Sequence, residues 1–131
     1  DVIVSCSNTT VPIVEGEWIR PGTHFSCMGA DQAWKQELAE GVHARCTIFC
    51  DHIDQICHLG EVSQSIEKGL LTRSQIKGTL RQVLTGAIEG RTSAEEITLF
   101  DGTGLAIQDA AVARRVYDLA ARDGFGVWAE L

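Results

Sequence analysis

The amino-acid sequence predicts an α/β protein built on a parallel sheet. Three short runs are rich in β-branched, aromatic or cysteine residues, as buried strands are: "DVIVSCS" (1–7), "THFSCMG" (23–29) and "CTIFCDH" (46–52). Strands that are buried on both faces show such continuous apolar runs, and they pair in parallel through crossover connections. The order strand, connection, strand, helix, strand therefore favours a sheet covered by helices.

Helices are expected in the connections that follow. The segment 31–44, "DQAWKQELAEGVHA", contains good helix formers and has a glycine where a helix would end. The pattern is again helical after Asp54. In the segment 74–90, apolar residues recur at helical spacing, which predicts one helix there; they are Ile76, Leu80, Val83 and Leu84.

The segment 96–109, "EITLFDGTGLAIQD", reads as a strand, a glycine-rich turn and the start of a helix. That helix is expected to end near Gly124, and its apolar face comprises Leu105, Val112, Val116 and Leu119. A helix start carries free backbone N–H groups, so the turn Gly102-Thr103-Gly104 is expected to present them to a ligand. A plain tight turn is the alternative.

Composition limits the possible functions. The 131 residues fit one domain, with 44% hydrophobic and 22% charged residues. The net charge of −7, without a Lys/Arg cluster, argues against a nucleic-acid partner. No apolar run approaches the roughly 20 residues of a membrane span, and no export signal is recognised. The five cysteines are odd in number and lie mostly in apolar runs, which favours a reducing cytoplasm over disulfides.

Cysteine and histidine residues crowd into the segment 46–58, where zinc binding is one interpretation; they are Cys46, Cys50, His52, Cys57 and His58. The spacing argues against it, because Cys46 and Cys50 alternate along one face of a strand and no C-x-x-C pair exists. We therefore expect core cysteines and no metal site. A cysteine nucleophile with a histidine base stays open as an alternative.

Polar residues at strand ends are further candidates. Asp31 follows the run 23–29 directly, at the edge where open α/β sheets bind ligands, although a helix N-cap is the alternative. Ser5, Ser7 and Asn8 end the first run, as ligand contacts or as turn formers. The remaining candidates are expected to be solvated acids or, for the tryptophan, a packing residue; they are Glu61, Glu95, Glu96 and Trp18.

A doubly wound nucleotide-binding sheet normally opens with a strand, a G-x-G-x-x-G turn and a helix. The nearest approach here is Gly102-Thr103-Gly104, which lacks the third glycine, and the chain starts directly in a strand-like run. We therefore expect the second half of a Rossmann-like doubly wound parallel sheet plus C-terminal helices.

The runs 1–38 and 89–120 resemble the ornithine cyclodeaminase and mu-crystallin family of NAD(P)-dependent enzymes. The combination of "PGTHFSCMGAD" with "ITLFDGTGLAIQD" is specific to that family. The resemblance implies that residues 1–100 are the C-terminal part of a dinucleotide-binding domain. It also implies that residues 101–131 are a helix returning towards a substrate-binding and dimerisation domain.

Members of the family oxidise the α-carbon of an amino acid to an imine, or reduce a cyclic imine, by hydride exchange with the nicotinamide. In the cyclodeaminases ammonia then leaves and the hydride returns, which gives proline. The resemblance thus implies ornithine cyclodeaminase-like chemistry on an amino-acid substrate with NAD or NADP. The alternatives are a ketimine reductase or amino-acid dehydrogenase of the same family, and a truncated binding or dimerising module without turnover.

The resemblance also assigns roles to single positions. Asp31 stands where these enzymes keep a catalytic aspartate, which mu-crystallin-like members lack. Thr103 stands at a position that lines the substrate site. Cofactor contacts are implied for Ser7, Phe25, Ser26, Cys27, Met28 and Lys35. Gly102 stands where the family often has a serine beside the nicotinamide, so that side-chain contact is lost.

In the family that the chain resembles, the glycine-rich pyrophosphate turn, the acid that reads the ribose, and the Lys and Arg that hold the substrate carboxylate all belong to an N-terminal part that is missing here. We therefore expect the isolated chain to bind NAD(H) weakly or not at all and to be inactive. A homodimer, or association with the missing N-terminal half, would complete the site.

Overall fold

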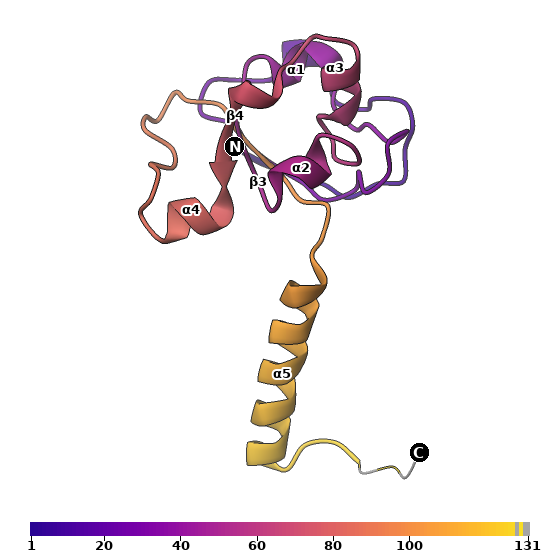
Figure 1. The fold of residues 1–131 in the computed structure, drawn as a ribbon, viewed down its shortest axis with the longest axis vertical. Helices are drawn as coiled ribbons and strands as arrows, with labels where there is room; N and C mark the ends of the chain where they lie inside the picture. The colour runs from indigo at the N-terminus through magenta and orange to yellow at the C-terminus, as the bar shows by residue number, and fades with distance from the viewer. Residues whose placement is uncertain (128, 130–131) are drawn as a thin grey trace.

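The computed structural model, which describes residues 1–127 and 129, has a single parallel sheet of five strands in the order β1-β2-β5-β3-β4 (Figure 1). This confirms the predicted α/β class. The strands are β1 (Val2–Ser5), β2 (His24–Cys27), β3 (Thr47–Cys50), β4 (Ile76–Thr79) and β5 (Thr98–Asp101). The α-helices are α1 (Glu40–His43), α2 (Ile53–Ile56), α3 (Ser63–Glu67), α4 (Leu80–Leu84) and α5 (Ala106–Asp123). Turns of 3-10 helix lie at Gly16–Trp18 and Arg73–Gln75.

The main core lies between one face of the sheet and the helices α1 and α2. Side chains alternate along each strand, so this face takes every second residue. The sheet contributes Phe25, Cys27, Ile48, Cys50 and Leu99, and the helices and loops contribute Ile19, Leu38, Val42, Ile56, Val62 and Leu71. The fold is thus held by apolar burial at the central strands.

The opposite face of the sheet is only partly covered. Helix α4 packs over it through Leu80 and Val83, which line a cavity of about 360 Å³ together with Phe49 and Phe100. On the edge strand β1, the Val4 side chain is 66% exposed. Helices therefore lie on both faces, as in a doubly wound sheet, but the layer on this face is incomplete.

The prediction of one helix over 74–90 is wrong at both ends, because only Leu80–Leu84 is α-helical and residues 85–90 form turns and irregular structure. Ile76–Thr79 is strand β4, which pairs with β3 at the edge of the sheet, and the helix begins only at Leu80. Ile76 is buried by this pairing, whereas Leu80 is 42% exposed. Thr79 caps the helix by accepting the Gln82 N–H, so the spacing of apolar residues spans two elements.

The helix expected over 31–44 is also reduced, since only Glu40–His43 is helical. The preceding residues are held extended: the Ile13 and Val14 N–H groups both donate to the Glu37 carbonyl, and Val14 forms a bridge with Leu38. The Glu37 and Leu38 N–H groups donate to the Glu61 carboxylate. Because these groups are used by tertiary contacts, helix propensity does not decide the conformation here.

Helix α5 ends as predicted, with Gly124 in the left-handed conformation at φ 72°. Figure 1 shows the helix extending away from the rest of the chain, and none of its residues is buried. Its predicted apolar face is therefore uncovered. Of the predicted unit 101–131, residues 128, 130 and 131 lie outside the described residues.

Three smaller expectations can be compared with the structure. The helical pattern after Asp54 is confirmed as two short helices, α2 and α3. Trp18 is 62% exposed, so its predicted packing role is wrong. Among the helices that the structure describes, none is long and apolar enough to cross a membrane.

Candidate functional site

The carboxyl ends of the strands form one continuous edge. Backbone hydrogen bonds link the residue after each strand to the end of its neighbour: Met28 N–H donates to Ser5 O at 2.8 Å and Gly102 N–H to Cys27 O at 2.9 Å. The segments that follow β1, β2 and β5 thereby start side by side. Several predicted site residues lie in these segments: Ser7 follows β1, Met28, Asp31 and Lys35 follow β2, and Gly102 and Thr103 follow β5, whereas Phe25, Ser26 and Cys27 lie within β2.

Met28 and Gly102 are in direct contact at this edge. A Cβ atom on Gly102 would lie 2.8 Å from Met28 Sδ and 3.0 Å from Phe100 Cε1. Met28 itself is 44% exposed. The position where the family often has a serine is therefore a glycine that makes room for the Met28 thioether.

Asp31 is an exposed carboxylate paired with a lysine one helical turn later in the sequence. Lys35 Nζ donates to Asp31 Oδ1 at 2.6 Å, and the Asp31 side chain is 54% exposed. The hydrogen bond from Lys35 lowers the pKa of Asp31. No helix starts at Asp31, so the N-cap interpretation is wrong. The group is an ionised, accessible carboxylate at the end of β2.

The predicted cofactor contacts on β2 are divided between the two faces of the strand. Phe25 and Cys27 are buried in the core, and burial raises the pKa of the Cys27 thiol well above its usual value. Ser26 is half-buried and points to the opposite face. Only the backbone of Phe25 and Cys27 is therefore left for contact with a ligand.

The turn after β5 does not offer free N–H groups, contrary to the expectation from the sequence. The Asp51 carboxylate accepts the Thr103 N–H at 3.0 Å and the Gly104 N–H at 2.9 Å. The Thr103 hydroxyl also donates to it, at 3.3 Å. A side chain of this chain thus occupies the place where the sequence suggested a bound anion, and Thr103 is tied to β3.

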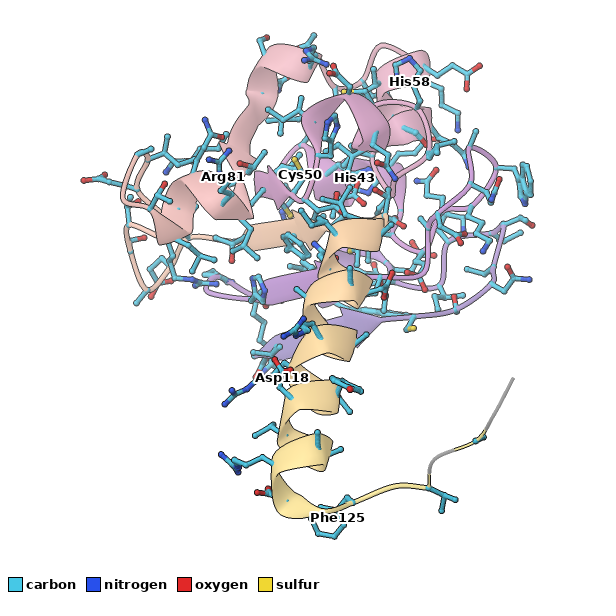
Figure 2. The ribbon with its side chains drawn as sticks, turned by 60° about the horizontal axis from the view of Figure 1, so that its bottom comes forward. His43, Cys50, His58, Arg81, Asp118 and Phe125 are labelled. Atoms are coloured by element: carbon cyan, nitrogen blue, oxygen red, sulfur yellow. The ribbon has the colours of Figure 1, made fainter. Side chains whose placement is uncertain are left out.

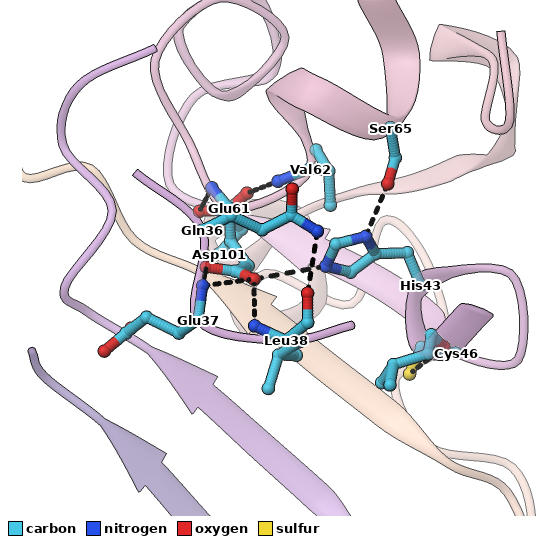
Figure 3. A network of polar contacts seen from close by, with 10 residues as sticks. Gln36, Glu37, Leu38, His43, Cys46, Glu61, Val62, Ser65 and Asp101 are labelled. Atoms are coloured by element: carbon cyan, nitrogen blue, oxygen red, sulfur yellow. Dashed lines mark hydrogen bonds and ion pairs between the residues drawn. The ribbon is translucent and has the colours of Figure 1, made fainter. Parts of the chain in front are cut away.

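A group of buried carboxylates lies beneath the edge (Figure 3). Asp101, the last residue of β5, accepts the N–H groups of Glu61 and Val62, both at 3.1 Å. Burial raises the pKa of Asp101 to about 8. A Cβ atom on Gly60 would lie 2.6 Å from Asp101 Oδ2, so glycine is needed for this close packing.

Glu61 is the second carboxylate of this group, and its expected position on a solvated surface is wrong because it is fully buried. It accepts the Glu37 N–H at 2.9 Å and the Leu38 N–H at 2.7 Å. His43 Nε2 lies 3.3 Å from Glu61 Oε1, and His43 Nδ1 lies 2.7 Å from Ser65 Oγ. No local pattern in the sequence signals this burial.

Glu37 is the third carboxylate. Its Oε1 atom accepts both the Ser7 N–H at 2.6 Å and the Ser7 hydroxyl at 2.7 Å. Its Oε2 atom is buried and has no hydrogen-bond partner within the described part of the chain. Ser7, a predicted cofactor contact, is half-buried. The three carboxylates are thus linked through backbone N–H groups. Asp101 accepts the Glu61 N–H, Glu61 accepts the Glu37 N–H, and Glu37 accepts the Ser7 N–H.

Four of the five cysteines lie in or against the core, as predicted: Cys27 and Cys50 are buried and Cys46 and Cys57 are partly buried, whereas Cys6 is exposed. Cys50 and His43 are both buried, whereas Asp118 lies on α5 and Phe125 lies beyond the end of that helix (Figure 2). Burial raises the pKa of the Cys46 and Cys50 thiols to about 12, so neither is a ready nucleophile at neutral pH. Within residues 1–127 and 129, no group of three His, Cys, Asp or Glu side chains is arranged to hold a metal ion.

Comparisons with known proteins give a consistent result. A family model for the ornithine cyclodeaminase/mu-crystallin family matches residues 1–124. The chain is 40% identical over 126 residues to an alanine dehydrogenase of Archaeoglobus fulgidus, covering 96% of this chain and 39% of that protein. It is 41% identical over 124 residues to an iminosuccinate reductase of Paracoccus denitrificans, covering 95% of this chain and 38% of that protein.

Solved structures agree. The structure of an archaeal alanine dehydrogenase dimer with bound NAD superposes with a TM-score of 0.91 at 39% identity, over all of this chain and 41% of that chain. The fold is therefore Rossmann-like, and this chain spans about two fifths of the length of these relatives. With its strand-end motifs, its parallel sheet and these matches, the chain belongs to the ornithine cyclodeaminase/mu-crystallin family.

Proposed function

We propose that this chain forms part of an NAD(P)-dependent oxidoreductase that exchanges a hydride between the nicotinamide and the α-carbon of a small amino acid or its imine. The observation that carries the proposal is Asp31, an accessible, ionised carboxylate at the carboxyl end of β2. Ligands of open α/β sheets bind at this edge. The relatives named alanine dehydrogenase and iminosuccinate reductase support the reaction class.

The residues at this edge fit the nicotinamide end of a dinucleotide. The exposed Met28 thioether is an apolar, polarisable surface suited to a flat ring, and Gly102 beside it adds no side chain. Ser7 supplies a half-buried hydroxyl. When it is bound, the dinucleotide accepts or supplies the hydride. The N–H groups of Thr103 and Gly104 are not available for the phosphates, because Asp51 accepts both of them.

Asp31 would bind the substrate amine and carry a proton to or from it. A carboxylate holds an ammonium group by charge-assisted hydrogen bonds and, as a general base, can take a proton from it before the hydride leaves the α-carbon. The bond from Lys35 keeps Asp31 ionised, and Lys35 would keep its proposed cofactor role only by sharing its ammonium with Asp31. Thr103, held by Asp51, would line the substrate.

Cyclodeamination is the second candidate, since the same aspartate serves it in the family that the sequence resembles. The full-length protein should be incubated with NAD⁺ and L-alanine, L-aspartate or L-ornithine while NADH and ammonia are followed. A dehydrogenase accumulates NADH. A cyclodeaminase releases ammonia from ornithine without net NADH. A binding module without turnover does neither, and that result would contradict the proposal.

The substitution Asp31→Asn tests the proposed catalytic role of Asp31 directly. It keeps the shape of the side chain but removes the charge and the base, so we expect kcat to fall about 10²- to 10⁴-fold with little change in NADH affinity. The matched control is Asp118→Asn on α5, which also removes an exposed carboxylate from an i,i+4 ion pair, here with Arg114. Turnover of Asp31→Asn close to that of the wild type would exclude a catalytic role.

A further inference from the structure

The Ser7 hydroxyl has its proton committed before any ligand arrives. Glu37 Oε1 already accepts the Ser7 N–H at 2.6 Å, and the Ser7 Oγ atom lies 2.7 Å from the same oxygen. In this contact the serine hydroxyl is the donor and Glu37 Oε1 is the acceptor, so the proton between the two oxygens comes from the serine. Both donors of Ser7 are therefore used by Glu37, and only the two lone pairs of Oγ remain.

We propose that Glu37 is a positioning residue that makes the Ser7 hydroxyl a hydrogen-bond acceptor for the dinucleotide, a proposal that rests on the proposed function. An acceptor takes a donor group of the cofactor, which is a ribose hydroxyl, the carboxamide N–H or the adenine amino N–H. Phosphate oxygens carry no proton to donate at neutral pH, so Ser7 does not bind the pyrophosphate. The hydroxyl is thus directed to a ribose or a ring substituent of the cofactor and away from its phosphates.

The surroundings of Glu37 hold this arrangement in place. The Glu37 backbone N–H donates to Glu61, whose own N–H donates to Asp101 at the end of β5. Gly29 leaves the space that the pair needs, since a Cβ atom there would lie 2.6 Å from Glu37 Oε1 and 2.5 Å from Ser7 O. The acceptor is therefore preorganised by buried bonds that run from the central strand to the loop after β1.

A double-mutant cycle on the full-length protein tests the proposal through NADH affinity, measured by titration calorimetry. We expect Ser7→Ala to weaken NADH binding about 3- to 10-fold, the effect of one lost hydrogen bond. Glu37→Met should weaken it by a similar factor, because Ser7 is no longer oriented. The double variant should be no weaker than Ser7→Ala, since Glu37 acts only through Ser7.

Two further variants separate positioning from a general loss of structure. Glu37→Gln should retain most of the NADH affinity, because its Oε1 atom can still accept both bonds from Ser7. The matched control is Glu96→Met at the opposite edge of the sheet. Glu96 also accepts a backbone N–H and hydroxyls, from Thr92 and Thr47. This control should lower the melting temperature and leave NADH affinity unchanged.

The donor on the cofactor is identified with the reduced 3-acetylpyridine analogue, which keeps the ribose hydroxyls and lacks the carboxamide N–H. If Ser7→Ala still weakens binding of the analogue, the donor is a ribose hydroxyl or the adenine amino group; if the effect vanishes, it is the carboxamide. Either result supports the proposal.

Two results would overturn it. One is an NADH affinity of Ser7→Ala equal to that of the wild type. The other is a double variant in which the losses of affinity from Ser7→Ala and Glu37→Met add. Both results leave the proposed function standing. If the wild-type protein binds NADPH and not NADH, the same cycle is measured with NADPH; a wild-type protein that binds neither would overturn the proposed function and this proposal together.

Discussion

Two carboxylates at opposite edges of the sheet make similar hydrogen bonds and have opposite pKa shifts. Asp101 ends β5 and accepts two backbone N–H groups, yet its pKa is raised to about 8 by burial. Glu96 precedes β5 and accepts the Thr47 hydroxyl at 2.6 Å and the Thr92 N–H at 2.5 Å, and its pKa is lowered to about 2, chiefly by the Thr47 bond. Hydrogen bonding is alike, so the degree of burial decides the sign.

This difference means that the acids at the carboxyl edge of the sheet have a larger desolvation free energy than the acid at the amino edge. At the carboxyl edge, the acids are removed from water and held by backbone groups, so each would be expensive if it lost its partners. At the amino edge, the acid keeps part of its hydration. The candidate site lies at the carboxyl edge, where the acids are buried. This is expected if buried polar groups hold the loops of the site in place.

The largest effect is expected from Glu61→Ala, at the centre of the buried group. The substitution leaves the Glu37 and Leu38 N–H groups without an acceptor and His43 without its carboxylate, all of them buried. We expect the free energy of unfolding to fall by about 3–5 kcal/mol in urea denaturation. Glu67→Ala on the exposed side of α3 is the control and should change it by less than about 0.5 kcal/mol. Equal effects would show that burial at this edge carries no special cost.

The Asp101 pKa predicts a dependence of stability on pH. The folded chain keeps a proton that the unfolded chain, with an ordinary pKa of 3.8, releases. Stability from this group is therefore complete below about pH 4 and falls as pH rises towards 8, by up to about 1.4 kcal/mol per pH unit. Asp101→Asn should flatten this slope, as measured by urea denaturation across the range. A slope that is unchanged in the variant would contradict the raised pKa.

The smallest effect on stability is expected from Glu96→Gln, and the pH dependence that Glu96 contributes has the opposite sign to that of Asp101. The lowered pKa of Glu96 gives stability that is present above its usual value of 4.5 and is lost as pH falls towards 2. Because the side chain is only partly buried, we expect the variant to lose about 0.5–1 kcal/mol at neutral pH. It should lose less than the wild type on acidification, when both are followed by thermal unfolding. A larger loss than that of Glu61→Ala would reverse the ranking of the two edges.

Local patterns predicted much of the fold and little of the buried site. The first three strands were predicted because their apolar runs are continuous, and the end of α5 was predicted because Gly124 is a common helix stop. Strand β4 was missed because Ile76 and the α4 residues together imitate a helical period. The exposed Asp31 was found from its place after a strand, and its role remains a prediction.

The sequence by itself determined the elements that depend on neighbours in the chain: the α/β class, the parallel strands and the family resemblance carried by the strand-end motifs. Only the tertiary structure decided which acids are buried. Glu61 and Glu96 look alike in the sequence, yet one meets the backbone of residues 37 and 38 inside the molecule and the other meets Thr47 and Thr92 near its surface. Desolvation and long-range hydrogen bonds set the chemistry of a carboxylate, and both depend on segments that are distant in the chain.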